Sequence, residues 1–338
     1  MNHKEFAQRL KAGEIRGVYL FEGVEENIKD AALAALRKSL LPEGMEELNE
    51  AVMDNPPTDA LIAAAETLPF LADKRLVVVR DHAGLTGRGE GDERLCAYLP
   101  KVPDTAVIVF FHRGKADARK KLFTAIKKAG QVVTFARLDE GELNAWIIQA
   151  FAGLGKRCAP RVASLLAFTT GTDTALLRSE IAKLAAHAGD AGEVTEEDVR
   201  LLATRSIECT VFEMVDAVVA GRQGQAFRLM RDMLTAGQDR LGILAMLLRQ
   251  YRLIQHVKIM QYEKKSSQEI RQNLGVPSFA ADRCVAQARG YTGGQVRRAV
   301  DICLETEYRV KAGQLNQEGA LEAAMLRIFA LCAPEAVG

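Results

Sequence analysis

The sequence predicts an α/β domain followed by an entirely helical region, a fold class of α/β plus all-α. Strand and helix patterns alternate over residues 1–138. The strand patterns are short, unbroken apolar runs, which are typical of a parallel sheet covered on both faces. From Leu138 onward only helical periodicity remains. We therefore expect a five-stranded parallel sheet domain over 1–138, a small helical domain over 139–205 and a larger helical domain over 206–338.

The elements of the first domain follow from these apolar runs. The run Leu76–Val79 suits the interior of a parallel sheet, and Ala106–Phe111 is the most apolar run of all. The expected strands are 17–21, 48–53, 76–79, 106–111 and 132–135. The segments between and before them show helical spacing, which predicts helices over 6–10, 27–40, 59–67, 94–99 and 117–128.

The remainder of the chain is predicted to be helical. A capping-box pattern at Thr195–Asp198 opens one helix, and Gly275-Val276-Pro277 is expected to interrupt the helices of the last domain. The other expected helices are 143–151, 160–168, 172–187, 210–220, 223–235, 241–262, 267–274, 292–311 and 317–331. No repeat of fixed period is present in the sequence.

Composition narrows the class of protein. The 338 residues carry a formal net charge of +1, so nucleic-acid binding would have to rest on a local patch. No apolar run reaches transmembrane length and the N-terminus lacks a signal-peptide core, so we expect a cytoplasmic protein without a membrane partner. The six cysteines form no CxxC pair and lie at no metal-ligand spacing to a histidine; we expect reduced thiols and no metal.

A glycine turn between the first strand and helix is where a phosphate-binding loop would lie. Aligned with GxxxxGK[ST], the sequence keeps Gly23 and Lys29 but places Ile28 at the second glycine and Asp30 at the metal-binding hydroxyl. Ile28 lacks the conformational freedom of glycine, and the acidic residues of this segment would repel phosphate. We expect no ATP binding, no catalytic residue elsewhere and no cofactor.

The connection before the third strand is unusual because it carries large apolar residues. Pro69 ends the preceding helical pattern at Leu68, and Phe70 and Leu71 then fall in a short connection. Such residues are either packed under the edge of the domain or presented to a partner. The residues alone leave both interpretations open.

A basic cluster follows the fourth strand. It comprises Arg113, Lys115, Arg119, Lys120 and Lys121, with Lys127 and Lys128 further along and one acid, Asp117, among them. Such a cluster fits either a surface for the DNA backbone or an ordinary solvated helix face.

An ordered series of segments along nearly the whole chain resembles the family of bacterial DNA polymerase III delta subunits. No single segment is decisive, but their order is specific. One departure is Glu307, where the family often has an aspartate. The segments are Val18–Glu25, Leu68–Leu71 with Lys74–Val79, Gly171–Asp173 with Leu176–Leu177 and Glu180–Leu184, Val211–Ala217, Leu248–Arg252, Glu307–Gly313 and Ala320–Glu322.

The resemblance implies a clamp-loader subunit with an AAA+-type sheet domain, a helical lid over 139–205 and a helical collar over 206–338. Such subunits bind and open the beta sliding clamp, which is then loaded onto primed DNA during replication, without hydrolysing ATP. They are non-catalytic parts of the DNA-directed DNA polymerase holoenzyme, a nucleotidyltransferase. The implied partners are the clamp, the gamma/tau and delta-prime subunits of a pentameric ring, and primed DNA.

The resemblance also assigns the unusual connection. In the family, the apolar pair before the basic start of the middle strand enters a pocket of the clamp. That pair is Phe70 and Leu71 here, with Leu68 and Pro69 shaping the approach. The basic cluster would then contact the DNA backbone. Two alternatives remain: an active AAA+ ATPase of unknown substrate, and a helical adaptor on an AAA+ frame unconnected to replication.

Overall fold

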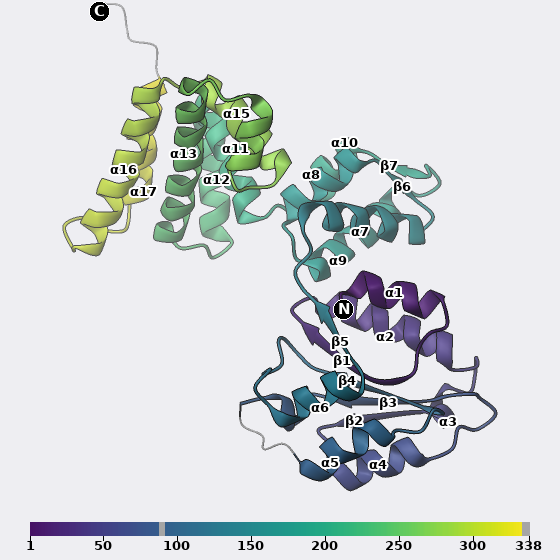
Figure 1. Cartoon of the computed structure of the whole chain (residues 1–338). Helices are drawn as coiled ribbons and strands as arrows, with labels where there is room; N and C mark the ends of the chain where they lie inside the picture. The colour runs from purple at the N-terminus through teal and green to yellow at the C-terminus, as the bar shows by residue number, and fades with distance from the viewer. Residues whose placement is uncertain (88–91, 333–338) are drawn as a thin grey trace, which may run out of the picture. The chain divides into compact units, whose positions relative to one another are not determined.

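The computed structural model describes residues 1–87 and 92–332. The chain divides between Asp139 and Glu140 into two compact units, which Figure 1 shows in purple to blue and in teal to yellow. The first unit contains the predicted parallel sheet and the second is mainly helical. The further division expected at residue 205 stays a prediction.

The first unit is built on a five-stranded parallel sheet in the order β2-β3-β4-β1-β5. The central strand β4 consists of six buried apolar residues, as its sequence predicts. Because parallel strands need crossover connections, helices cover both faces of the sheet. The strands are β1 (Gly17–Gly23), β2 (Glu50–Asp54), β3 (Arg75–Arg80), β4 (Ala106–Phe111) and β5 (Gln131–Phe135).

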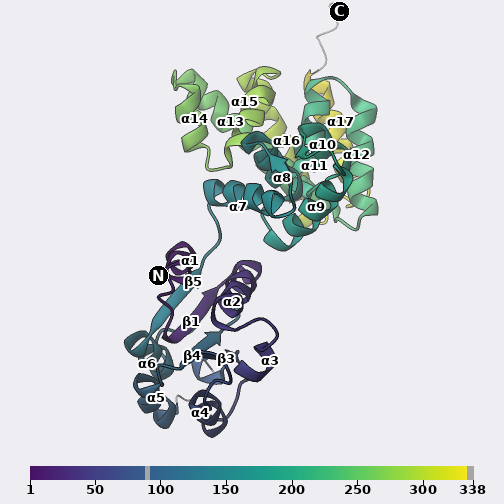
Figure 2. The same ribbon diagram turned by 90° about the vertical axis from the view of Figure 1, so that its right-hand side faces the viewer.

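Two apolar clusters, one on each face, hold the helices to the sheet. Alternate residues along a strand point to opposite faces, so Val77 and Val79 join one cluster while Leu76 and Val78 join the other. Helices α4 (Thr58–Glu66), α5 (Glu93–Tyr98) and α6 (Lys121–Ala129) contribute to the first cluster, and α1 (His3–Lys11) and α2 (Glu26–Leu40) to the second. Figure 2 shows α1 and α2 on one side of the sheet and α4, α5 and α6 on the other.

Close packing requires glycine at the last residue of β1 and at one position beside this strand. A Cβ on Gly23, whose φ is +119°, would lie 2.2 Å from the carbonyl oxygen of Phe135. A Cβ on Gly130 would lie 1.9 Å from the carbonyl oxygen of Val18. Neither residue can carry a side chain without moving the backbone of β1 or β5.

The prediction of one helix over 117–128 is wrong at its start, because α6 begins at Lys121. The Asp117 carboxylate accepts the backbone N–H of Arg119 at 3.0 Å, and the backbone N–H of Lys120 bonds to the Asp117 carbonyl. This local turn competes with helix formation, as aspartate side chains commonly do. The sequence analysis also missed three short elements of this unit, α3 (Glu46–Asn49) and the 3-10 helices η1 (Ala83–Leu85) and η2 (Leu99–Lys101).

The second unit begins with four helices and a small parallel strand pair. The expectation that strands end at Leu138 is wrong for β6 (Arg157–Cys158) and β7 (Glu193–Val194), which pair with each other. Two residues are too few to show alternation in the sequence. The helices are α7 (Glu140–Gly153), α8 (Pro160–Thr170), α9 (Thr174–His187) and α10 (Glu196–Leu202), the last opening with the predicted capping box at Thr195.

Seven further helices surround one large apolar core. The expected interruption at Gly275–Pro277 is real, but the sequence analysis missed α15 directly after it, because its buried stripe consists of small residues such as Ala281 and Cys284. None of the described helices is long and apolar enough to span a lipid bilayer. The helices are α11 (Ile207–Val219), α12 (Gln223–Thr235), α13 (Arg240–Tyr262), α14 (Ser267–Asn273), α15 (Ser278–Arg289), α16 (Gly293–Lys311) and α17 (Ala320–Cys332).

Candidate functional site

The connection between α4 and β3 presents an exposed apolar tip, defined here as residues 68–71. Leu68 is 76% exposed, Phe70 54% and Leu71 74%, while Pro69 is half-buried. The neighbouring strand residues Leu76 to Val79 are fully buried, so exposure begins at this connection. Packing under the domain edge, one of the two interpretations left open by the sequence, does not fit these values. The tip is a local apolar surface directed to solvent.

The backbone of the apolar tip is fixed by a residue that the sequence analysis missed. Asn49, at the end of α3, is fully buried, and its side-chain amide bonds to both the N–H and the C=O of Phe70. Leu71 follows with a φ of +50°, in the left-handed region that non-glycine residues rarely adopt. A single asparagine at the end of a four-residue helix gives no periodic signal, so the contact could not be predicted from the sequence.

The basic residues after the apolar tip anchor its base. The Arg75 guanidinium donates to the carbonyl oxygens of Ala64 at 3.0 Å and Leu48 at 2.8 Å. These bonds connect β3 to the last turn of α4 and to α3. The Lys74 ammonium donates to the carbonyl of Asp104. Both side chains therefore hold the scaffold from which the apolar tip projects.

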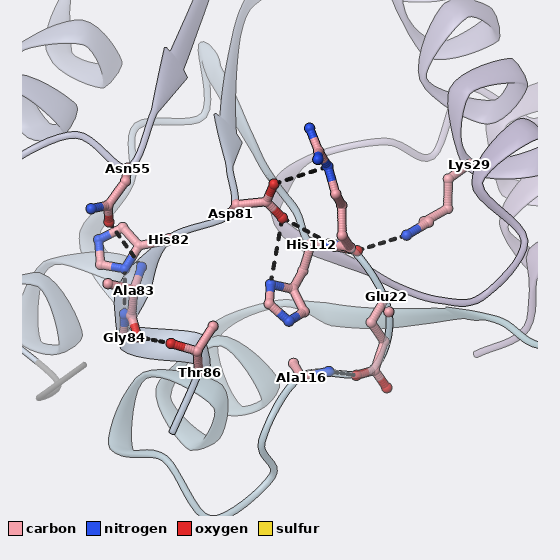
Figure 3. A network of polar contacts seen from close by, with 12 residues as sticks. Glu22, Lys29, Asn55, Asp81, His82, Ala83, Gly84, Thr86, His112 and Ala116 are labelled. Atoms are coloured by element: carbon pink, nitrogen blue, oxygen red, sulfur yellow. Dashed lines mark hydrogen bonds and ion pairs between the residues drawn. The ribbon is translucent and has the colours of Figure 1, made fainter. Parts of the chain in front are cut away.

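At the phosphate-loop position, the structure places the Lys29 ammonium in a buried internal network. Its Nζ lies 2.7 Å from the carbonyl oxygen of His112 (Figure 3). It also lies 2.7 Å from Glu26 Oε1 and 5.1 Å from the centre of the Phe111 ring. The side chain of Lys29 is 0% exposed. The positive charge that a phosphate would need is thus already neutralised by a carboxylate.

The backbone amides of this loop are also engaged within the chain. Gly23 N–H donates to the Gly114 carbonyl at 2.6 Å, and Glu25 N–H donates to the Phe135 carbonyl at 3.2 Å. Ile28 packs against the apolar cluster below α2, and Asp30 is exposed. A phosphate-binding loop instead directs its amides at the ligand.

The two histidines at the carboxyl edge of the sheet are buried, and burial lowers the pKa of both His82 and His112. His82 Nδ1 accepts a hydrogen bond from Gly84 N–H at 3.1 Å. His112 Nδ1 lies 3.9 Å from Asp81 Oδ1 (Figure 3), beyond hydrogen-bonding distance. Asp81 itself accepts from Arg113 N–H at 2.9 Å. These contacts hold the segments that follow β3 and β4 in place, and none of them positions a nucleophilic side chain beside a histidine.

The basic cluster does not form one helix face, because most of it precedes α6. Its members have carboxylate or carbonyl partners: Arg113 with Asp81, Arg119 with Asp117, Lys121 with Glu93 and Lys120 with the Gly87 carbonyl. Hydrogen bonds from Arg119 lower the pKa of Asp117 to about 2. Lys115 is exposed and has no side-chain partner within the described part of the chain. The role of this cluster on DNA stays a prediction.

Buried thiols and metal-ligand geometry give no further site. Burial raises the pKa of Cys158, Cys209 and Cys284 to about 11 and that of Cys303 to about 12, so these side chains are protonated at neutral pH. Within residues 1–87 and 92–332, no three histidine, cysteine or carboxylate side chains are grouped so that they could hold a metal ion.

Comparison with known proteins gives matches in both units. The family model described as "DNA polymerase III, delta subunit" matches residues 19–136, and the one described as "DNA polymerase III delta subunit, C-terminal domain" matches residues 208–328. The DNA polymerase III subunit delta of Bacillus subtilis is 26% identical over 329 residues, which are 95% of each chain.

A solved structure agrees with these matches. The Bacillus subtilis DNA clamp loader delta protein superposes with a TM-score of 0.53 at 26% identity, covering 97% of this chain and 99% of that one. This likeness, together with the parallel five-stranded sheet and the mainly helical second unit, confirms the predicted fold class of a parallel α/β sheet domain followed by helices. The chain therefore belongs to the family of DNA polymerase III delta subunits, the delta components of the clamp loader.

Proposed function

We propose that this chain binds a sliding clamp through the apolar tip, residues 68–71, and holds one clamp interface open without hydrolysing ATP. One observation carries the proposal: three apolar side chains are exposed within four residues, on a backbone that Asn49 holds at Phe70. Arg75 anchors the neighbouring α3 and α4. A fixed aromatic and aliphatic pair is the usual composition of an interface anchor, which contributes about 2 kcal/mol or more when it enters a pocket.

The opening step follows from differential binding. A protein shifts a closed–open equilibrium of its partner only by the difference between its affinities for the two states. Contacts of Phe70, Leu71 and their flanks with an open clamp interface must therefore be more favourable than contacts with a closed one. If the closed clamp is favoured about a hundredfold, shifting it to mostly open requires the binding free energies for the open and closed states to differ by about 5.5 kcal/mol.

We further propose that the chain does not use ATP. The proposal rests on the loop at Gly23–Asp30, where the Lys29 ammonium is paired with Glu26 and the loop amides of Gly23 and Glu25 bond to backbone carbonyls. Nucleotide binding would have to break these contacts and expose a buried lysine. No cofactor is needed for a clamp-binding role.

The proposed partners are the beta sliding clamp, the gamma/tau and delta-prime subunits of a pentameric ring, and primed DNA held in the assembled complex. Large apolar side chains exposed on α13, α16 and α17 support assembly through the proposed collar, residues 206–338. They include Tyr262, which is 90% exposed, Tyr308 at 66%, and Ile259 and Leu326 at 50% each. DNA contact by the basic cluster at 113–121 would compete with the ion pairs that hold Arg113, Arg119 and Lys121.

The test is a pull-down with the sliding clamp of the same organism, using wild type, Phe70→Ala/Leu71→Ala and a control, Leu154→Ala/Leu176→Ala. The control removes two leucines of comparable exposure, 51% and 57%, from the second unit. We expect wild type and control to retain the clamp and the first variant to lose it. If wild type ignores the clamp, the proposed function is wrong; if Phe70→Ala/Leu71→Ala binds equally well, the assigned site is wrong.

An active ATPase, the first alternative, predicts ATP hydrolysis by the isolated chain that Lys29→Ala abolishes. We expect no hydrolysis by either protein. A helical adaptor unconnected to replication, the second alternative, predicts that the pull-down recovers no clamp with any variant.

A further inference from the structure

Asn49 uses both polar atoms of its side-chain amide to hold a residue 21 positions away. Its Oδ1 accepts the backbone N–H of Phe70 at 2.6 Å, and its Nδ2 donates to the Phe70 carbonyl at 2.9 Å and to the Met45 carbonyl at 3.1 Å. Both amide hydrogens and the amide oxygen are thus engaged, and the side chain is 0% exposed. No other function of the chain described above requires this arrangement.

The two bonds to Phe70 reproduce the pairing of a β-ladder. In a hydrogen-bonded antiparallel pair, one residue exchanges both its N–H and its C=O with the residue opposite. Phe70 lies in neither a strand nor a helix, so the Asn49 amide supplies what a neighbouring strand would. The next residue, Leu71, has a left-handed φ of +50°, a conformation that persists only where the surroundings impose it.

We propose that Asn49 is a positioning residue, which holds Phe70 and Leu71 in their clamp-binding conformation before the clamp arrives. This inference rests on the proposed function and deepens it, since it adds a residue that never touches the clamp. A tip ordered in advance loses little conformational freedom on binding and so binds more tightly. The amide accepts from the N–H and donates to the C=O of the same residue, whereas an ionised aspartate can only accept and would direct an oxygen at two carbonyls.

The variants that test this role are Asn49→Ala and Asn49→Asp, with Asn273→Ala as the matched control. Asn273 ends α14 and donates to the carbonyl four residues earlier, as Asn49 does to Met45, but it holds no distant segment. Freeing even one backbone residue costs about tenfold in affinity when it must be ordered again. We expect the clamp dissociation constant to increase at least about tenfold in both Asn49 variants and to stay within twofold of wild type in Asn273→Ala.

Hydrogen exchange of the free protein gives a readout that does not depend on the clamp. We expect the Phe70 amide to exchange slowly in wild type and quickly in Asn49→Ala. Rapid exchange of that amide in folded wild type would overturn the proposal without any variant, even if no variant folds. We also expect Asn49→Ala to cost little further affinity in the background of Phe70→Ala, because both changes act through one anchor.

The outcomes separate this inference from the proposed function. Absence of clamp binding by wild type would refute the proposed function, whatever the exchange data show. Suppose that wild type binds the clamp, that Phe70→Ala/Leu71→Ala does not, and that Asn49→Ala binds as tightly as wild type. This outcome would refute only the positioning role. Additive losses in the double variant Asn49→Ala/Phe70→Ala would likewise contradict it, since independent sites add.

Discussion

Replacing Phe70 by alanine removes the aromatic anchor of the apolar tip. The wild-type side chain is 54% exposed, so about half of its possible burial is still available to a partner. Full burial of a phenylalanine side chain is worth about 1.5–3 kcal/mol, which leaves about 1–1.5 kcal/mol for the clamp to gain. A well-packed, desolvated anchor contributes about 2 kcal/mol. We therefore expect the clamp dissociation constant to increase about tenfold to thirtyfold.

The assay is equilibrium binding of the purified chain to immobilised clamp, with thermal unfolding measured in parallel. Because Phe70 is in none of the apolar core clusters, we expect Phe70→Ala to lower the free energy of unfolding by less than about 1 kcal/mol, well below the 3–5 kcal/mol of a core phenylalanine. Leu154→Ala serves as control for loss of exposed apolar surface. An unchanged dissociation constant for Phe70→Ala would refute the reasoning, as would an equal loss in Leu154→Ala.

Three further predictions concern the scaffold. Lys29→Met should lower the free energy of unfolding by about 2–3 kcal/mol in urea titrations, since it leaves Glu26 and a buried carbonyl without their cation, yet leave clamp binding unchanged. Burial lowers the pKa of His82 and His112, so the unfolded chain binds more protons than the folded chain below pH 6.5. The free energy of unfolding should therefore be highest above that pH and decline as the pH falls towards 5. The decline should be shallower in His82→Gln. Gly130→Ala should lower the melting temperature by several degrees, because its Cβ would meet a β1 carbonyl at 1.9 Å; a melting temperature equal to wild type would contradict this.

The sheet could be predicted because its strands are buried on both faces. Leu76–Val79 and Ala106–Phe111 have no polar residue to interrupt them, and such runs between helices have few other structural solutions. The edges of elements were harder to predict. Asp117 stops α6 from starting earlier through a side-chain bond to the backbone, an effect that periodicity does not register.

The candidate site was predicted only in part. The residues alone left open whether Phe70 and Leu71 are exposed, and the family resemblance supplied both their exposure and a partner. The support beneath them could not be predicted, because it depends on long-range contacts. Asn49 reaches Phe70 across 21 residues, and Arg75 joins α3 to α4 through two carbonyls. Such contacts leave no local pattern, since each needs the folded sheet to bring its partners together.

The most direct test of the central claim is a measurement of clamp opening. A fluorescent donor and acceptor placed across one interface of the sliding clamp would report its separation when the isolated chain is added without nucleotide. We predict that wild type lowers energy transfer across that interface and that Phe70→Ala/Leu71→Ala leaves it unchanged. Unchanged transfer with saturating wild type, or equal opening by the variant, would contradict the claim that this chain opens the clamp through residues 68–71.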